Sequence, residues 1–330
     1  MRRAVAGVRA ETPELPAVPG TLEPEVVSLS DADMTYALYL PRDYSTDRLW
    51  PVLVCLDPAA RGTVPVTRFK EAADFHGFIL IGSNHAKNYD AKSVERSLTA
   101  ILGDLGERYA VHADGVYATG FSGGARVALT LASQFGHFSG VIACGAGFHP
   151  EYPPDPFVRF PVLMTLGLAD SNYCFMRAQY RMLQKYGRDV SMLLFDGGHD
   201  WPSAEMCHWA LGWLRLRGED NGVMPADPEW RTLFAQALVD RAGQLLADGK
   251  PVEAMCALDM MNEGQAHRSG VSDRIRELRK QAREHPGFLA ERELVRIETG
   301  KMREIESDMA HCKQQGLDNQ ERSRTVSYTH

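Results

Sequence analysis

The stretch GVYATGFSGGARVAL, residues 115–129, decides the fold of this chain. An apolar β-like run precedes a single serine, Ser122, and a run of small and apolar residues with helical spacing follows it. Gly120 and Gly124 stand two positions before and after the serine, where they relieve crowding in a sharp strand-to-helix turn. Such a turn exposes a serine hydroxyl above the edge of a sheet. The stretch therefore predicts that Ser122 is a nucleophile, with an inert glycine-rich turn as the alternative.

Short apolar strands alternate with helical patterns on both sides of this turn. Continuous apolar runs, as in 51–56, are typical of strands that are buried on both faces. Strands are predicted at 34–40, 51–56, 78–82, 116–119, 140–144, 161–166 and 191–195, and helices at 94–109, 125–135, 173–186 and 203–216. This alternation predicts an α/β fold with a mostly parallel sheet flanked by helices.

The composition changes near residue 217, after which no strand is predicted. The expected organisation is an extended leader, an α/β domain, a linker, an all-α C-terminal extension and a disordered tail, at 1–25, 26–217, 218–228, 229–317 and 318–330. Two predicted helices of the extension, 230–247 and 252–261, resemble one tetratricopeptide-type unit. A lone unit of that type cannot bury its own apolar face. The extension is therefore a candidate surface for a protein partner or for self-association.

The overall composition excludes several classes of function. The 330 residues are 44% hydrophobic and 24% charged, which allows a large buried core. A net charge of −7 without a long basic run makes nucleic acid a poor partner. No run of about 18 apolar residues is present, so no membrane span is expected.

The basic residues 1–10 lack the apolar core of a signal peptide, but 8–10 resemble the remnant of a cleavage site. The compartment stays open: cytoplasmic as written, exported if the N-terminus is truncated.

A nucleophilic serine needs a base within hydrogen-bond reach and a third group that orients the base. In open α/β sheets such groups gather beyond the carboxyl ends of the strands. Asp170 follows the predicted strand 161–166, and His199 follows the predicted strand 191–195. We therefore predict that Ser122, Asp170 and His199 act together as nucleophile, orienting acid and base.

Each of these partners has a rival in the sequence. Asp196 and Asp200 flank His199, but neighbours on one short loop rarely point at its ring. His208 lies on a predicted helix, where a packing or surface role is expected. Among the cysteines, no C-x-x-C pair suggests a zinc site. Cys174 and Cys207 follow Asp170 and His199, and a disulfide between them is a hypothesis that would favour an exported protein.

Four segments resemble the α/β-hydrolase superfamily, and most of all its branch of small, cap-free esterases similar to polyhydroxybutyrate depolymerases and feruloyl esterases. These segments are LPRDY, GFSGG, GLAD and GGHDWP, at 40–44, 120–124, 167–170 and 197–202. The resemblance covers residues 26–217. It implies a serine carboxylic-ester hydrolase that needs no metal or cofactor. It implies much less about the substrate, because this fold hosts many activities.

One segment departs from that resemblance. Relatives often carry His-Gly after the third strand, which supplies a backbone donor to the oxyanion. This chain has LDPAARG at 56–62, and Pro58 lacks an N–H group. The expected donors are therefore the N–H of Gly123 and that of Ala59, with the N–H of Ala60 as the alternative to Ala59. A plain turn at the end of the strand is the alternative reading of this segment.

Five side chains close to these loops are candidate walls of a substrate pocket. They are His85, Phe121, Phe148, Tyr173 and Trp201. Aromatic residues there can equally belong to the core, and His85 can stabilise its own loop. The loop 145–160 is short and rich in proline, so no lid is expected, and an open cleft favours small or exposed acyl esters. The alternative functions are a serine peptidase of the same fold and a pseudoenzyme whose helical extension binds a partner.

Overall fold

One eight-stranded sheet forms the centre of the molecule, in the order β1-β2-β4-β3-β5-β6-β7-β8. The structure is a computed structural model that describes residues 16–136, 138–149, 158–298 and 300. β1 pairs antiparallel with β2 and β2 with β4, and all other neighbours are parallel. The predicted mostly parallel sheet is confirmed. The strands are β1 Leu22–Val27, β2 Thr35–Tyr39, β3 Trp50–Leu56, β4 Ile79–Ser83, β5 Val111–Phe121, β6 Val141–Cys144, β7 Val162–Gly167 and β8 Val190–Phe195.

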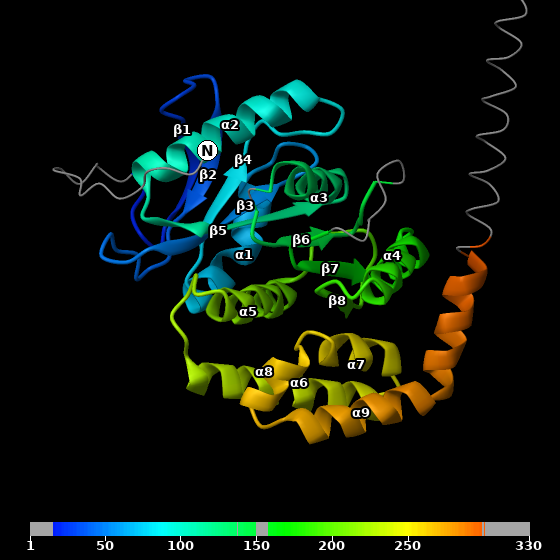
Figure 1. The fold of residues 1–330 in the computed structure, drawn as a ribbon. Coiled ribbons are helices and arrows are strands. Elements are labelled where there is room, and N and C mark those ends of the chain that lie inside the picture. The colour runs from blue at the N-terminus through cyan, green and yellow to red at the C-terminus, as the bar shows by residue number, and fades with distance from the viewer. Residues whose placement is uncertain (1–15, 137, 150–157, 299, 301–330) are drawn as a thin grey trace, which may run out of the picture.

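Helices cover both faces of this sheet (Figure 1). Because side chains alternate along a strand, β3 sends Val52 and Val54 to one apolar cluster and Leu53 to the other. The first cluster is covered by α2 Ala91–Arg108, α3 Gly123–Phe135 and α4 Tyr173–Lys185, and the second by α1 Thr63–His76 and α5 Ala204–Asp220. The three-layer arrangement of an α/β protein results, with α4 and α5 on opposite faces.

The C-terminal helices form a further layer beneath α5 and along the edge strand β8 (Figure 1). They are α6 Pro228–Ala247, α7 Pro251–Leu258, α8 Glu263–Arg268 and α9 Ser272–Glu284, and the chain is helical again over 286–298. Their apolar side chains share one cluster with α1 and α5, in which Phe234 of α6 packs beside Trp230. The core of the all-α extension is therefore continuous with that of the α/β domain.

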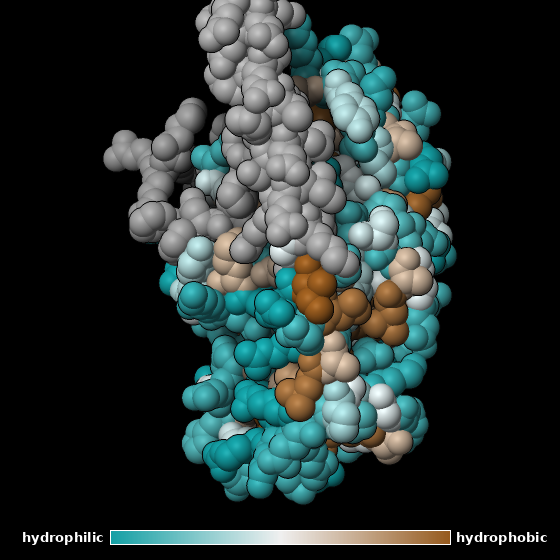
Figure 2. Space-filling view, turned by 90° about the vertical axis from the view of Figure 1, so that its right-hand side faces the viewer, coloured by the Kyte–Doolittle hydropathy of each residue, from teal (hydrophilic) through white to brown (hydrophobic). Residues whose placement is uncertain are grey.

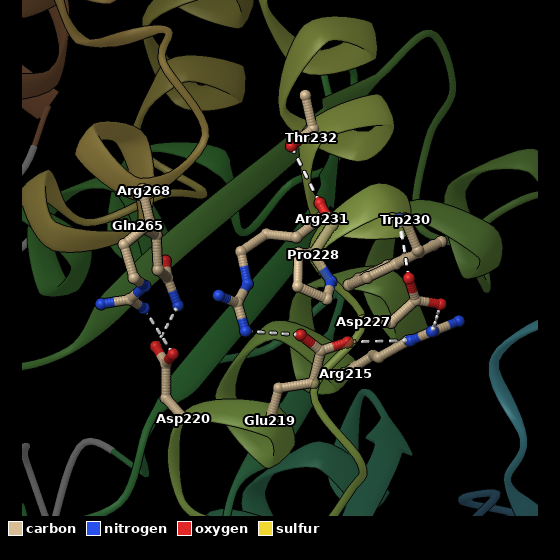
Figure 3. Close-up of polar contacts among 10 residues, drawn as sticks. All are labelled: Arg215, Glu219, Asp220, Asp227, Pro228, Trp230, Arg231, Thr232, Gln265 and Arg268. Atoms are coloured by element: carbon tan, nitrogen blue, oxygen red, sulfur yellow. Dashed lines mark hydrogen bonds and ion pairs between the residues drawn. The ribbon is translucent and has the colours of Figure 1, made fainter.

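Charged side chains fix the junction between α5 and α6 (Figure 3). The fully buried carboxylate of Glu219 accepts hydrogen bonds from Arg215 at 3.3 Å and from Arg231 at 2.7 Å. Asp227 caps α6 by accepting from the N–H of Trp230 at 3.0 Å, and Pro228 follows at the first helical position. Hydrogen bonds and apolar packing thus hold the extension in one orientation.

Apolar side chains are also exposed on the stretch 286–298. Leu289, Leu294 and Ile297 are 54%, 51% and 42% exposed. Figure 2 looks onto this side of the molecule, and brown residues gather there among teal ones. Within the described residues, none of the helices combines the length and the apolar character needed to cross a bilayer.

Several boundaries differ from the sequence prediction. β1 begins at Leu22, within the expected leader, and a bulge between Glu23 and Val26 accommodates Pro24 on this edge strand. α5 extends through Asp220 into the expected linker. The helices α1 and α8 were not predicted, since α1 opens with β-branched residues and proline, which are poor helix formers. Residues 1–15 of the leader, the end of the extension beyond 300 and the tail 318–330 lie outside the described residues.

Candidate active site

Ser122 stands at the junction of β5 and α3 with an unusual backbone conformation. Its φ is 52° and its ψ is −117°, a strained combination for any residue with a side chain. A Cβ atom on Gly120 would lie 2.3 Å from the backbone of Gly124, and one on Gly124 would lie 2.0 Å from the carbonyl oxygen of Leu56. Only glycine fits at either position. The two glycines therefore allow the tight turn that presents the serine.

The structure brings the three predicted residues Ser122, His199 and Asp170 into one row. His199 Nε2 lies 3.0 Å from Ser122 Oγ, and His199 Nδ1 lies 2.9 Å from Asp170 Oδ2. The Asp170 side chain is fully buried, whereas that of His199 is 36% exposed. Asp170 Oδ1 accepts a hydrogen bond from the N–H of Asn172 at 2.8 Å. A buried carboxylate thus orients an imidazole whose other nitrogen faces the serine hydroxyl.

Backbone contacts between the loops after β7 and β8 hold Asp170 and His199 in register. The N–H of Leu168 donates to Phe195 at 2.9 Å, and that of Ala169 donates to Gly197 at 2.8 Å. A Cβ on Gly167 would lie 2.3 Å from the carbonyl oxygen of Gly198, so the close approach of the two loops requires glycine there. Gly167 therefore serves the same purpose as the glycines around Ser122.

The rival residues have other partners. Asp196 forms an ion pair with Lys250 at 3.1 Å, and Asp200 accepts from the N–H of Trp201 at 2.6 Å. The ring of His208 lies 4.5 Å from that of His76 and is tilted against it, between α5 and α1. None of the three rivals is hydrogen-bonded to Ser122 or His199 in the part of the chain that the structure describes.

The two expected oxyanion donors differ in availability. Gly123 N–H, at the first position of α3, makes no hydrogen bond to any described residue, as is usual for the first N–H groups of a helix. The N–H of Ala59 instead donates to Asp57 Oδ1 at 2.9 Å, and that of Ala60 donates to the Asp57 carbonyl at 3.0 Å. The N–H of Ala59 is therefore already used within the turn, which disfavours it as an oxyanion donor, and its role there stays a prediction.

Asp57 organises this turn and connects it to the loop of His199. Its side chain is fully buried and also accepts from Arg61 Nε at 2.9 Å and from Trp201 Nε1 at 3.1 Å. Burial acts to raise the pKa of Asp57, but the hydrogen bonds from Arg61, Ala59 and Trp201 outweigh it and leave the pKa below its ordinary value. The sequence predicts only a turn at Asp57 and holds no signal for its contact with Trp201, which lies far away along the chain.

Of the five candidate pocket walls, Phe121 has its side chain against the ring of His199. Its ring lies 4.7 Å from that of His199 and 5.6 Å from that of Trp201. Trp201 itself is 3% exposed and packs on Phe69, which favours a role in bracing the loop from the core.

The other three candidates are held by contacts elsewhere. Phe148 is buried, and its backbone is hydrogen-bonded at both N and O by the side chain of Gln179. The hydroxyl of Tyr173 donates to Glu291 at 3.2 Å, in the helical stretch 286–298. His85 Nε2 lies 3.2 Å from Thr35 Oγ1. These contacts favour structural roles. The middle of the proline-rich loop expected to form no lid, 150–157, lies outside the described residues.

The disulfide hypothesis is wrong. Cys174 and Cys207 are both free thiols. Cys174 belongs to α4 and Cys207 to α5, which cover opposite faces of the sheet. Although Cys174 follows β7 and Cys207 follows β8, which are neighbouring strands, the helices that carry them belong to different layers of the fold.

Solved structures share this architecture at low sequence identity. The fluorophosphonate-binding serine hydrolase F of Staphylococcus aureus, in a substrate-bound form, is 15% identical, and the match covers 60% of this chain and 99% of that one with a TM-score of 0.50. S-formylglutathione hydrolase of the same organism is 14% identical over 61% and 99% with a TM-score of 0.48, and a ferulic acid esterase is 16% identical over 59% and 97% with a TM-score of 0.49. No family model and no curated protein matches this chain. The chain has the α/β-hydrolase fold.

Proposed function

We propose that this protein is a serine carboxylic-ester hydrolase that acts through an acyl-enzyme. The observation that carries the proposal is the row of Ser122, His199 and Asp170, in which consecutive side chains are 3.0 and 2.9 Å apart. A hydroxyl, an imidazole and a buried carboxylate in this order form the arrangement that activates serine nucleophiles on unrelated folds. The strained turn at Ser122 adds support, because backbone strain concentrates at functional sites.

In the proposed mechanism, His199 carries the proton between the reacting groups. Asp170 accepts from His199 Nδ1–H and fixes the tautomer, so that Nε2 takes the proton of Ser122 as its Oγ bonds to the ester carbonyl carbon. The N–H of Gly123 donates to the oxyanion of the tetrahedral intermediate. His199 then protonates the departing alkoxide, and the alcohol leaves. Water, deprotonated by His199, attacks the acyl-enzyme in the same way and releases the acid and Ser122.

We propose small or exposed acyl esters as the substrates. The 36% exposure of the His199 side chain supports this class, since a base so close to solvent suits a substrate that enters an open site. The ester reading and the peptidase alternative make different predictions, because peptidases turn over activated amides as well as esters.

The test is hydrolysis of p-nitrophenyl esters, from acetate to decanoate, by the wild type and by Ser122→Ala. We expect activity on the short chains that falls by roughly 10⁴-fold or more in the variant. The matched control is Ser133→Ala, on the same helix, whose hydroxyl donates to the carbonyl of Leu129 at 2.8 Å. Its activity should equal that of the wild type. Faster turnover of p-nitroanilides would favour the peptidase, and equal activity of Ser122→Ala and the wild type would refute the mechanism.

A partner surface or a self-association surface on the helical extension, and its tetratricopeptide character, stay predictions. The observation behind the surface is the exposure of Leu289, Leu294 and Ile297 on one helical stretch. Sedimentation velocity over a wide range of concentrations tests self-association. A mass that stays monomeric throughout would leave a different protein as the partner of this surface.

A further inference from the structure

The proposed mechanism has one backbone donor to the oxyanion, the N–H of Gly123, and lacks the second. Oxyanion sites usually combine at least two donors, and each is worth a large factor in rate. The turn after β3 was expected to supply the second, but the N–H groups of Ala59 and Ala60 donate to Asp57. Another donor has to lie near Gly123.

The loop between β4 and α2 is fastened to that same turn. The N–H of Asn88 donates to the carbonyl of Pro58 at 2.9 Å, and Lys87 pairs with Ala59 in an isolated antiparallel bridge. These backbone contacts carry residue 88 over the turn and towards the start of α3. The position of Asn88 is therefore set by the backbone and does not depend on its side chain.

The side-chain amide of Asn88 lies directly against Gly123. A Cβ atom on Gly123 would lie 1.9 Å from Asn88 Oδ1 and 2.4 Å from Nδ2, so the amide fills the place of a side chain at position 123. The amide is half-buried and makes no hydrogen bond with any described residue. Since no partner determines which way the amide faces, its –NH₂ group is available to either side.

We infer that Asn88 Nδ2 is the second donor to the oxyanion, beside the N–H of Gly123; the inference rests on the proposed function. As Ser122 Oγ bonds to the carbonyl carbon, the C=O electron pair moves onto oxygen, and the two donors stabilise that charge. Asn88 gives up no proton. This role also explains the glycine at position 123, because any side chain there would displace the amide.

Three variants test the inference with the p-nitrophenyl ester that the wild type prefers. Asn88→Ala should lower kcat by about 10²- to 10³-fold with KM changed by less than about threefold, because an oxyanion donor acts in the transition state. Asn88→Asp should be slower still, since it places a carboxylate beside the oxyanion. Lys87→Ala, the matched control on the same loop, should keep wild-type rates. A trifluoromethyl ketone, which forms a tetrahedral oxyanion with the serine, should lose affinity for Asn88→Ala by the same factor as kcat.

A double-mutant cycle separates a catalytic role from a structural one. Gly123→Ala should lower kcat in the wild type by pushing the amide away, and should cost little in the Asn88→Ala background. Additive losses, an unchanged affinity of Asn88→Ala for the ketone, or a loss in kcat below about threefold would each overturn the role of Asn88 while Ser122-dependent turnover stands. A wild type without Ser122-dependent turnover would overturn the proposed function, and this inference with it.

Discussion

Asp57 should be essential to the stability of the active-site edge, and Asp57→Ala tests this. Its carboxylate is fully buried and accepts from Ala59, Arg61 and Trp201. Removing it leaves the indole N–H of Trp201 buried and unpaired, which costs about 1–3 kcal/mol. The ion pair with Arg61, whose side chain is 57% exposed, adds at most about 1 kcal/mol. The N–H of Ala59, near the surface, adds less than a buried donor.

The expected sum is therefore about 2–4 kcal/mol of unfolding free energy. For a chain of 330 residues each kcal/mol lowers Tm by about 1.4 °C, so calorimetry should show a fall of roughly 3–6 °C. Trp201 stands two residues after His199, and a small displacement of a catalytic group can cost up to about 10²-fold in rate. We expect kcat for ester hydrolysis to fall by about tenfold at a temperature where the variant is folded.

The pH dependence gives a further check. Because the pKa of Asp57 is lowered in the folded protein, its contribution is present above the unfolded pKa of about 4 and is lost as pH falls through the folded pKa. The stabilities of wild type and Asp57→Ala should therefore converge in acid. The matched control is Asp43→Ala, which removes an exposed pair with Arg48 and should cost less than about 1 kcal/mol. A cost at pH 7 no larger for Asp57→Ala than for this control would refute the reasoning.

Three further substitutions probe the rest of the molecule. Glu219→Ala leaves the guanidinium groups of Arg215 and Arg231 facing a buried gap, and should cost about 3–5 kcal/mol in urea unfolding. His76 is buried, and neither of its ring nitrogens has a hydrogen-bond partner among the described residues; burial foremost holds its pKa well below the ordinary value. Since the unfolded state then binds the proton first, wild-type stability should fall relative to His76→Phe by up to about 1.4 kcal/mol per pH unit below about pH 6.5. Gly124→Ala drives a Cβ to 2.0 Å from a backbone oxygen and should cost more than about 2 kcal/mol in thermal unfolding.

Each of these has an outcome that would contradict it. If Glu219→Ala unfolds in two transitions, an added early one and a main one at the wild-type midpoint, the extension unfolds independently. Parallel pH profiles of wild type and His76→Phe would mean that His76 titrates as in the unfolded chain. Gly243→Ala is the control for Gly124→Ala, because nothing lies within 4 Å of a Cβ in that helix, and it should stabilise by up to about 1 kcal/mol. Equal effects at the two glycines would argue against a steric origin.

Much of the site could be predicted from the sequence because its requirements are local. The glycines beside Ser122 serve contacts within one turn, and hydrophobic periodicity marks the strand before it and the helix after it. Asp170 and His199 were predictable because the ends of parallel strands meet at one edge of the sheet. The helix α1 could not be found in this way, since packing of Val66 and Phe69 stabilises it and propensity does not.

Local patterns along the chain specify the α/β fold, the turn at Ser122 and the order of the three residues that meet there. Which polar groups are still available for chemistry depends on contacts that form when the chain folds. The N–H of Ala59 is used by Asp57, Trp201 is buried against that carboxylate, and the amide of Asn88 fills the space beside Gly123. The contacts of Trp201 with Asp57 and of Asn88 with Gly123 join residues of different loops, and the choice of partner there depends on distances of a few ångströms that no local pattern encodes.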